Sequence, residues 1–171
     1  MTDLAVFDKA FERLMDNEGG YVNHPLDPGQ ETMYGVTKRV AVDHGYRGDM
    51  RKLPKSLARD IAKKSYWDKS HCDRFDSRVA TQLFDASYNH GPVNAIKFLQ
   101  RAAGLNEKYV DGIIGPQTIG AVNQFDPNII VLRFLSKRLD FFTRLGTWKT
   151  FGKGWARRMA EQLESAAMDL Q

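Results

Sequence analysis

Residues 4–20 read LAVFDKAFERLMDNEGG, an apolar stripe on a helical period that runs into a pair of glycines. The apolar positions recur at intervals of three or four residues, which predicts one buried helix face made of Leu4, Phe7, Phe11, Leu14 and Met15. Thr2 or Asp3 can cap the start of this helix, and Gly19-Gly20 ends it. The chain therefore opens with an amphipathic helix.

Glu18 lies on the apolar side of this helix, because it follows Leu14 by four residues and Phe11 by seven. Partial desolvation raises the pKa of a carboxyl group, and a raised pKa lets a general acid keep its proton near neutral pH. Gly19 and Gly20 leave room for a long polymer to approach. The alternative is a structural Glu18 paired with an arginine, and spacing alone leaves both interpretations open.

The next stretch, residues 21–35, lacks the helical period and is rich in proline and glycine, which indicates a long loop or a short hairpin. Asp27 lies in this stretch, and Glu31 and Thr32 follow it. Glycoside hydrolysis usually needs a carboxylic acid and a second polar group that handles water or the positive charge of the transition state. Asp27 can be that second group, although Asp27-Pro28-Gly29 is equally typical of an ordinary turn.

The rest of the chain predicts helices joined by short connections. Thr37 can cap a helix that ends at Gly45, and a last helix begins near Gly154. Between them, proline, glycine and apolar spacing predict helices over residues 54–69, 77–89, 91–104, 116–125 and 127–145. About seven helices make an all-α domain, with any β structure, such as a small hairpin, confined to residues 21–36.

Composition narrows the class of protein. The 171 residues fit one domain, and the single cysteine, Cys72, excludes an internal disulfide and suits a reducing cytosol. The N-terminus lacks the basic and apolar segments of a secretory signal, and no apolar run approaches about 20 residues, so we expect neither a signal peptide nor a membrane span. The net charge of +4 favours approach to anionic polymers.

Several chemistries are disfavoured. No spacing of histidine and cysteine resembles a zinc site, and no phosphate-binding glycine loop is present, so we expect no metal and no cofactor. Basic residues are interleaved with acidic ones, which argues against nucleic-acid binding. The C-terminal helix carries an apolar stripe beside Lys153, Arg157 and Arg158; we expect it to pack on the domain, and weak contact with an envelope is the alternative.

A set of motifs, in order along nearly the whole chain, resembles glycoside hydrolase family 108, whose members are phage endolysins and related bacterial muramidases. The residues that carry the resemblance are Glu18-Gly19-Gly20-Tyr21-Val22-Asn23, Asp27-Pro28-Gly29, Glu31-Thr32, Tyr34-Gly35-Val36-Thr37, Tyr66-Trp67, Phe84-Asp85, Asn89-His90-Gly91-Pro92, Leu99-Gln100-Arg101-Ala102, Asp111-Gly112-Ile113-Ile114-Gly115-Pro116-Gln117-Thr118, Phe151-Gly152, Gly154-Trp155 and Arg157-Arg158. Two positions depart from the family pattern: Gln30 replaces a frequent second glycine, and His90 replaces a small residue.

The resemblance implies a lysozyme-like, all-α fold. It also implies hydrolysis of the β-1,4 bond between N-acetylmuramic acid and N-acetylglucosamine, with Glu18 as the general acid. Asp27 and Thr32 match the aspartate and threonine that phage lysozymes pair with such a glutamate. The threonine spacing is not identical, so Thr37 is the alternative to Thr32.

Three further residues are candidates for substrate binding. Tyr34 belongs to one of the motifs that carry the resemblance. Trp67 can stack on a sugar ring, with packing in the protein as the alternative. Asn89 can hydrogen-bond an N-acetyl group, or it can cap the helix that follows.

The resemblance also implies a biological setting. We expect a single domain over residues 1–171, with a catalytic part over 1–91 and a helical part over 92–171 that includes a peptidoglycan-binding-like segment at 111–118. The protein would be a monomeric endolysin, made in the host cytoplasm and acting on peptidoglycan in the periplasm or cell wall to lyse the host. The alternatives are a lytic transglycosylase, a bacterial muramidase outside phage lysis, and a non-catalytic cell-wall-binding protein.

Overall fold

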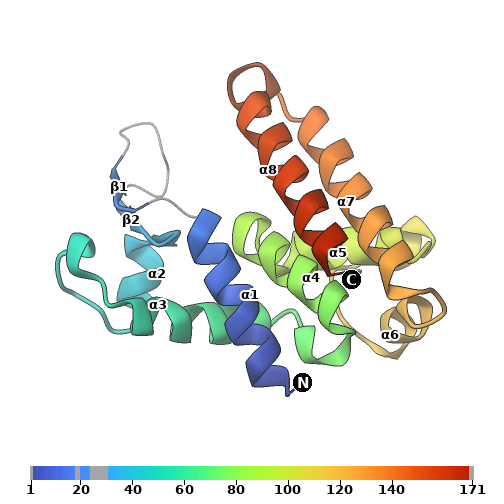
Figure 1. Cartoon of the computed structure of the whole chain (residues 1–171), viewed down its shortest axis with the longest axis horizontal. Helices are drawn as coiled ribbons and strands as arrows, with labels where there is room; N and C mark the ends of the chain where they lie inside the picture. Colours follow the sequence, from blue (N-terminus) through green and yellow to red (C-terminus); the bar gives the residue numbers. More distant parts are fainter. Residues whose placement is uncertain (1, 18–19, 24–30, 170–171) are drawn as a thin grey trace. The chain divides into compact units, whose positions relative to one another are not determined.

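The structure, a computed structural model, describes residues 2–17, 20–23 and 31–169. The chain divides into two compact units, residues 1–69 and 70–171. Eight α-helices and one small three-stranded sheet lie in the described residues (Figure 1). The expectation of an almost entirely helical protein with β structure near residues 21–36 is therefore confirmed, with eight helices where the sequence predicts about seven.

The first unit begins with helix α1 (Asp3–Asn17). Thr2 caps it, because the Thr2 hydroxyl oxygen accepts a hydrogen bond from the Ala5 backbone N–H at 3.3 Å. Most of the predicted apolar face is buried, but the side chain of Leu4 is 53 % exposed. The packed face starts one turn later, at Phe7, whose ring meets the Trp67 ring edge-on with centroids 5.4 Å apart.

The sheet of the first unit is antiparallel with strand order β1 (Val22–Asn23), β2 (Glu31–Met33) and β3 (Val36–Thr37). β2 and β3 are joined by Tyr34 and Gly35, whose φ angles are 54° and 75°. Positive φ at both central residues is the pattern of a tight type I′ hairpin turn. The predicted hairpin is thus a hairpin of β2 and β3 to which β1 adds a third strand.

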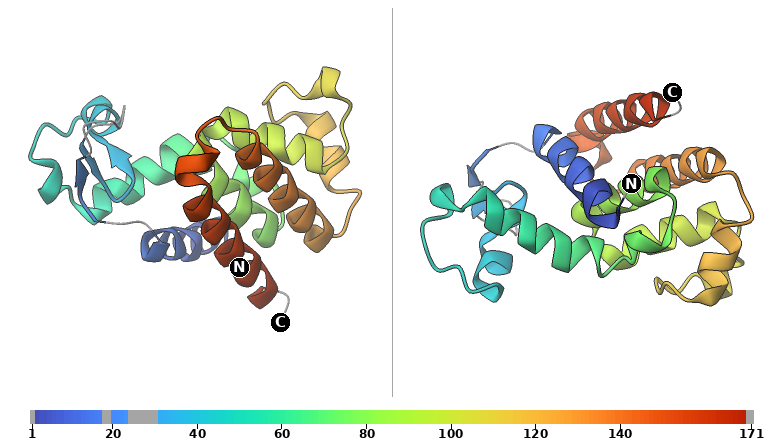
Figure 2. Two further views of the ribbon diagram at one scale, coloured as in Figure 1. Left: turned by 90° about the horizontal axis from the view of Figure 1, so that it is seen from above. Right: turned by 60° about the horizontal axis from the view of Figure 1, so that its bottom comes forward.

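The remainder of the first unit is helical. Thr37 caps α2 (Lys38–Asp43) as predicted, since its hydroxyl oxygen accepts from the Val40 N–H at 3.4 Å. A 3₁₀ turn, η1 (Met50–Lys52), leads to α3 (Lys55–Ala62), which continues into a π-helical turn, η2 (Lys63–Trp67). The sheet lies beside α2 in both views of Figure 2. Strand β3 is thus held on one side by the tight turn to β2 and on the other by α2, whose cap is its last residue, Thr37.

The second unit contains five of the α-helices. They are α4 (Ser77–His90), α5 (Pro92–Ala102), α6 (Pro116–Val122), α7 (Pro127–Thr143) and α8 (Trp148–Met168), with 3₁₀ turns η3 (Cys72–Arg74) and η4 (Glu107–Tyr109). Proline opens three of them, as the sequence predicts. α4 packs against α5 and α7, and α7 runs along α8 (Figure 1). No helix in the described ranges is long and apolar enough to cross a membrane.

Helix α8 begins at Trp148 and not near Gly154, so this predicted boundary is wrong. Glycines at 152 and 154 resemble a helix break in the sequence. Gly152 is instead a packing residue inside the helix, because a Cβ atom there would lie 2.6 Å from the Trp148 ring. The missing side chain lets the Trp148 ring lie on its own helix one turn away. Trp155 then stacks on Phe142 of α7 with ring centroids 4.9 Å apart, which packs the start of α8 on the unit.

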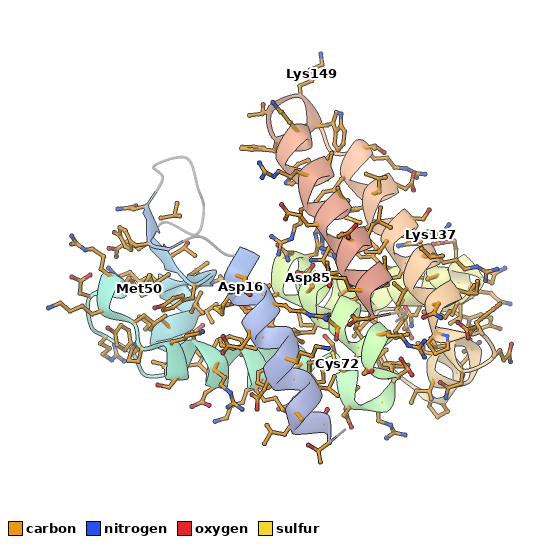
Figure 3. All side chains as sticks on the ribbon, viewed as in Figure 1. Asp16, Met50, Cys72, Asp85, Lys137 and Lys149 are labelled. Carbon is orange, nitrogen blue, oxygen red and sulfur yellow. The ribbon has the colours of Figure 1, made fainter. Side chains whose placement is uncertain are left out.

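A buried ionic network joins α4, α7 and α8. Asp85 accepts hydrogen bonds from Arg138 at 2.8 Å and from Arg158 at 3.1 Å. Figure 3 shows Asp85 among the helices of this unit. Burial opposes ionisation of this carboxyl group, but the two guanidinium groups outweigh it and hold the pKa of Asp85 below its ordinary value. The network fixes the three helices to one another through paired charge.

Candidate active site

Two of the predicted catalytic residues, Glu18 and Asp27, lie outside the described residues. The first described stretch ends at Asn17, which is the last residue of α1 and directly precedes Glu18 in the sequence. Strands β1 and β2 come before and after residues 24–30, which contain Asp27. The roles assigned to Glu18 and Asp27 therefore stay predictions. The elements that adjoin these two residues in the sequence, α1 and the sheet, are described.

Both candidate threonines lie on the sheet, directly opposite each other. Thr32 pairs with Thr37 of β3 on one side and with Val22 of β1 on the other. Side chains of directly opposed residues point to the same face of a sheet, so the three residues share one face. The hydroxyl group of Thr37 caps α2, whereas Thr32 is a half-buried residue in the middle strand. The fold therefore gives Thr37 a structural task and leaves Thr32 as the better candidate for chemistry.

Next to Thr32, Glu31 is the centre of a polar cluster that the sequence did not reveal. Its carboxylate accepts hydrogen bonds from the Tyr21 hydroxyl at 2.8 Å and from the Lys38 ammonium at 2.5 Å. The guanidinium of Arg51 lies 5.6 Å from the centroid of the Tyr21 ring. The hydrogen bonds from Lys38 and then Tyr21 lower the pKa of Glu31. The two donors thus favour the ionised form of Glu31, which argues against a role as general acid.

Tyr34 occupies the first central position of the β2–β3 turn with a φ angle of 54°. A bulky residue with positive φ is uncommon, because the side chain crowds the backbone. Such strained residues cluster at functional sites, where the surrounding structure holds them in place. The strain adds an independent reason to keep Tyr34 as a candidate for substrate binding.

Trp67 does not offer a ring face to a sugar, and the stacking prediction is wrong for this residue. Its side chain is 1 % exposed. The indole N–H donates to the Asp3 carboxylate at 2.9 Å, and the ring packs on Phe7. An amphipathic ring that buries its body and satisfies its N–H is a core residue. The packing alternative is the correct interpretation.

Asn89 lies exposed near the end of α4 in the second unit. Its side-chain N–H donates to the Asp85 backbone oxygen one turn earlier, at 2.7 Å. The N-cap of α5 is Gly91, so Asn89 does not cap the following helix. Its neighbour His90 packs among the rings of Phe98, Phe141 and Phe142. Burial lowers the pKa of His90 to about 3, so this histidine is neutral near pH 7.

The segment 111–118 is organised by one buried side chain, Gln100. The amide oxygen of Gln100 accepts from the Gly112 N–H at 2.9 Å. Its amide nitrogen donates to three oxygens of the segment, those of the Asp111 carboxylate, the Ile113 carbonyl and the Thr118 hydroxyl. Gly112 has a φ angle of 81°, which suits glycine. These contacts explain the segment's sequence as a turn pinned to α5.

Comparison with known proteins agrees with this arrangement. The family model described as Glycosyl hydrolase 108 matches residues 11–91, and the one described as Predicted Peptidoglycan domain matches residues 94–160. A solved structure titled "Structure of Brucella abortus SagA" is 33 % identical in sequence, with a TM-score of 0.85. The match covers 96 % of this chain and 95 % of that chain. No curated protein is significantly similar in sequence.

The two family matches and the likeness over nearly the whole chain establish the family and the lysozyme-like fold that the ordered motifs predict. The residues predicted to be catalytic, Glu18, Asp27 and Thr32, lie inside the first matched region, and the segment 111–118 lies inside the second. The chain belongs to glycosyl hydrolase family 108, and it is a glycoside hydrolase that acts on peptidoglycan.

Proposed function

We propose that the protein is an N-acetylmuramidase that hydrolyses the β-1,4 bond between N-acetylmuramic acid and N-acetylglucosamine. The observation that carries the proposal is the run from Glu18 to Thr37. In the sequence it combines a carboxyl group that directly follows an amphipathic segment with a second carboxyl group and a threonine, and it lies inside the region matched by family 108. Peptidoglycan has this bond in every disaccharide repeat of its glycan strand.

In this proposal Glu18 is the general acid. Protonation of the glycosidic oxygen by a carboxylic acid makes the sugar a better leaving group, and the remaining carbohydrate carries positive charge at its anomeric carbon. Asp27 and Thr32 orient the attacking water or stabilise that charge. The cap at Thr37 supports the choice of Thr32 over Thr37.

Outside the reacting bond, Tyr34 and Asn89 are the proposed substrate contacts. Tyr34 is held in a strained turn next to β2, and Asn89 is exposed near the end of α4. We further propose a monomeric endolysin that reaches peptidoglycan in the periplasm or cell wall and lyses the host, with residues 1–91 as its catalytic part and 92–171 as its helical part. Contact of α8 with the envelope would be weak, because part of this helix packs on α7.

The test of the proposed acid is the variant Glu18→Gln. It keeps the size of the side chain but removes the proton that the leaving group needs, so lysis of outer-membrane-permeabilised cells should fall by at least about 100-fold. The decrease in turbidity measures lysis, and circular dichroism checks the fold. Glu12→Gln is the matched control within α1, since Glu12 forms an exposed ion pair with Lys55 at 2.7 Å. Wild-type lysis by the Glu18→Gln variant contradicts the assignment, and it is what a non-catalytic wall-binding protein would give.

The products identify the reaction. Hydrolysis leaves reducing ends of N-acetylmuramic acid, whereas a lytic transglycosylase leaves 1,6-anhydro ends because no water enters. Mass spectrometry of digested peptidoglycan separates the two, as the products differ by one water molecule. We expect reducing ends, and anhydro ends would replace the hydrolase proposal with the transglycosylase.

A further inference from the structure

A groove in the second unit is lined by residues of α5 and α7, with Glu107 of η4 and Arg144 at the end of α7. Its volume is ≈ 570 Å³. The side chains that line it include four bases and two acids: Lys97, Arg101, Lys137, Arg144, Glu107 and Asp140. These groups give the groove a formal charge of +2. It therefore attracts a ligand with a surplus of negative charge.

The two acids of the groove are already paired. Arg101 holds Glu107 with two hydrogen bonds, at 2.8 and 3.0 Å. Arg144 holds Asp140 at 2.8 Å. Lys97 and Lys137, in contrast, have no carboxylate within ion-pair distance among the described residues. The groove thus contains two ammonium groups without an ion-pair partner among the described residues.

Apolar side chains form part of the same groove. Phe98 is almost fully buried and Phe141 is half-buried, and their ring centroids are 5.2 Å apart. Lys97 also approaches the turn at 111–118, because a Cβ atom added at Gly112 would lie 3.4 Å from the Cε atom of Lys97. The groove therefore combines an apolar floor with two ammonium groups, one of which lies on a side chain that reaches towards the turn held by Gln100.

We propose that this groove binds the acidic stem peptide of peptidoglycan, with Lys97 and Lys137 holding its carboxylates. The inference rests on the proposed function and names the part of the substrate that the second unit recognises. In intact peptidoglycan the lactyl carboxyl of muramic acid is bound in an amide, so the carboxylates belong to the peptide and not to the sugars. The groove residues run from 94 to 144, within the region matched by the Predicted Peptidoglycan domain.

The mixture of charges favours a peptide over a nucleic acid. A stem peptide carries carboxylates and, in its diamino acid, an amino group, together with the methyl groups of its alanines. Such a ligand can place carboxylates at the lysines, its amino group near Glu107 or Asp140, and methyl groups on the phenylalanine floor. A continuous row of phosphates would instead meet the two acids as like charges.

The test measures binding of a monomeric disaccharide-tetrapeptide to the full chain by isothermal titration calorimetry. In this probe muramic acid is the reducing end, so the β-1,4 bond from its anomeric carbon, which a muramidase cuts, is absent and the probe survives the measurement. We expect the double variant Lys97→Ala/Lys137→Ala to bind it about tenfold more weakly, because two exposed charge contacts are lost. Chitobiose, the N-acetylglucosamine disaccharide that carries no carboxylate, should bind weakly and equally to both proteins.

The matched control is Lys149→Ala/Lys153→Ala, which removes the same charge from exposed positions of α8. Figure 3 shows Lys137 projecting from the side of α7 and Lys149 from the start of α8. We expect this control to bind the probe within about twofold of wild type. An equal loss in both double variants, no loss in the groove variant, or tighter binding of single-stranded DNA than of the probe would overturn the proposal.

Activity separates this proposal from the proposed function. On glycan strands stripped of their peptides by an amidase, the groove variant should release reducing muramic acid ends at the wild-type rate. On intact sacculi it should be slower. If the wild type releases no such ends, the muramidase proposal fails, and the calorimetry still decides on the groove.

Discussion

An ion pair in the second unit and one in the first differ in how exposed their side chains are. In residues 70–171, Asp85 and Arg138 form an ion pair whose side chains are 8 % and 0 % exposed. In residues 1–69, Glu31 and Lys38 form an ion pair whose side chains are 22 % and 54 % exposed. The first pair joins α4 to α7 inside the buried network, whereas the second lies on a small sheet next to Thr32.

This difference separates charges that hold the fold from charges that are available to a substrate. A buried pair is costly to desolvate, but removing one partner costs even more because the other charge stays buried alone. An exposed pair contributes little to stability, and its members can exchange partners with a ligand or with water. The buried network of the second unit is thus expected to govern stability, and the sheet of the first unit to govern activity.

The largest expected effect on stability is that of Asp85→Ala. It leaves Arg138 and Arg158 without their shared carboxylate inside the second unit. The free energy of unfolding should fall by about 3–5 kcal/mol, measured by urea denaturation followed by circular dichroism.

Glu12→Ala in the first unit is the control for this prediction, because it breaks the exposed ion pair with Lys55. Its denaturation midpoint should stay close to that of wild type. Equal midpoints for the Asp85 and Glu12 variants would show that the buried network is no more important than a surface pair. If Asp85→Ala does not fold at all, Arg158→Lys gives a milder test, since it keeps the charge and removes the guanidinium geometry.

A second prediction concerns pH. Burial lowers the pKa of His90 to about 3, against an ordinary value of 6.5 in the unfolded chain. Between these values the unfolded chain binds a proton that the folded chain does not, so stability is present above pH 6.5 and is lost as the pH falls towards 3. From pH 7 to pH 4.5 the free energy of unfolding should fall by about 2 kcal/mol through this residue.

His90→Phe should remove this part of the pH dependence, because phenylalanine keeps the ring and cannot be protonated. The variant His44→Phe makes the same replacement at an exposed position of the first unit and serves as the comparison. Urea denaturation at the two pH values measures both. An unchanged slope in His90→Phe would assign the acid sensitivity to carboxyl groups instead.

Local signals in the sequence predicted most of the fold. Thr37 caps its helix, and Pro92, Pro116 and Pro127 open theirs, because the preferences of these residues act within one turn. The Asp85 network left no such signal, since Asp85 and Arg138 are 53 residues apart in the sequence. Tertiary packing also explains two errors of the sequence prediction: Leu4 is exposed on α1, and Gly152 lies inside α8.

For the candidate site, the motifs indicated which residues could act, but they did not indicate the burial or the contacts of those residues. A tryptophan ring can stack on a sugar, yet the ring of Trp67 packs on Phe7 in the core. Nothing in the sequence distinguishes Glu31 from the other acidic residues, because its contacts with Tyr21 and Lys38 depend on the fold. The register of the sheet was also beyond local spacing, although it is what places Thr32 opposite Thr37.

The smallest expected change in stability, and the sharpest test of the comparison, comes from these two threonines. Thr37→Ala removes the cap of α2, which should cost about 1 kcal/mol in unfolding free energy and leave lysis near the wild-type rate. Thr32→Ala should have the opposite profile, with an almost unchanged denaturation midpoint and lysis reduced by at least about tenfold. Turbidity assays and urea denaturation of the two variants give both quantities, and Thr32→Ser should recover activity because it restores the hydroxyl group. If Thr37→Ala loses lysis and Thr32→Ala retains it, the assisting threonine is Thr37 on β3, and the half-buried Thr32 does not serve the chemistry as proposed.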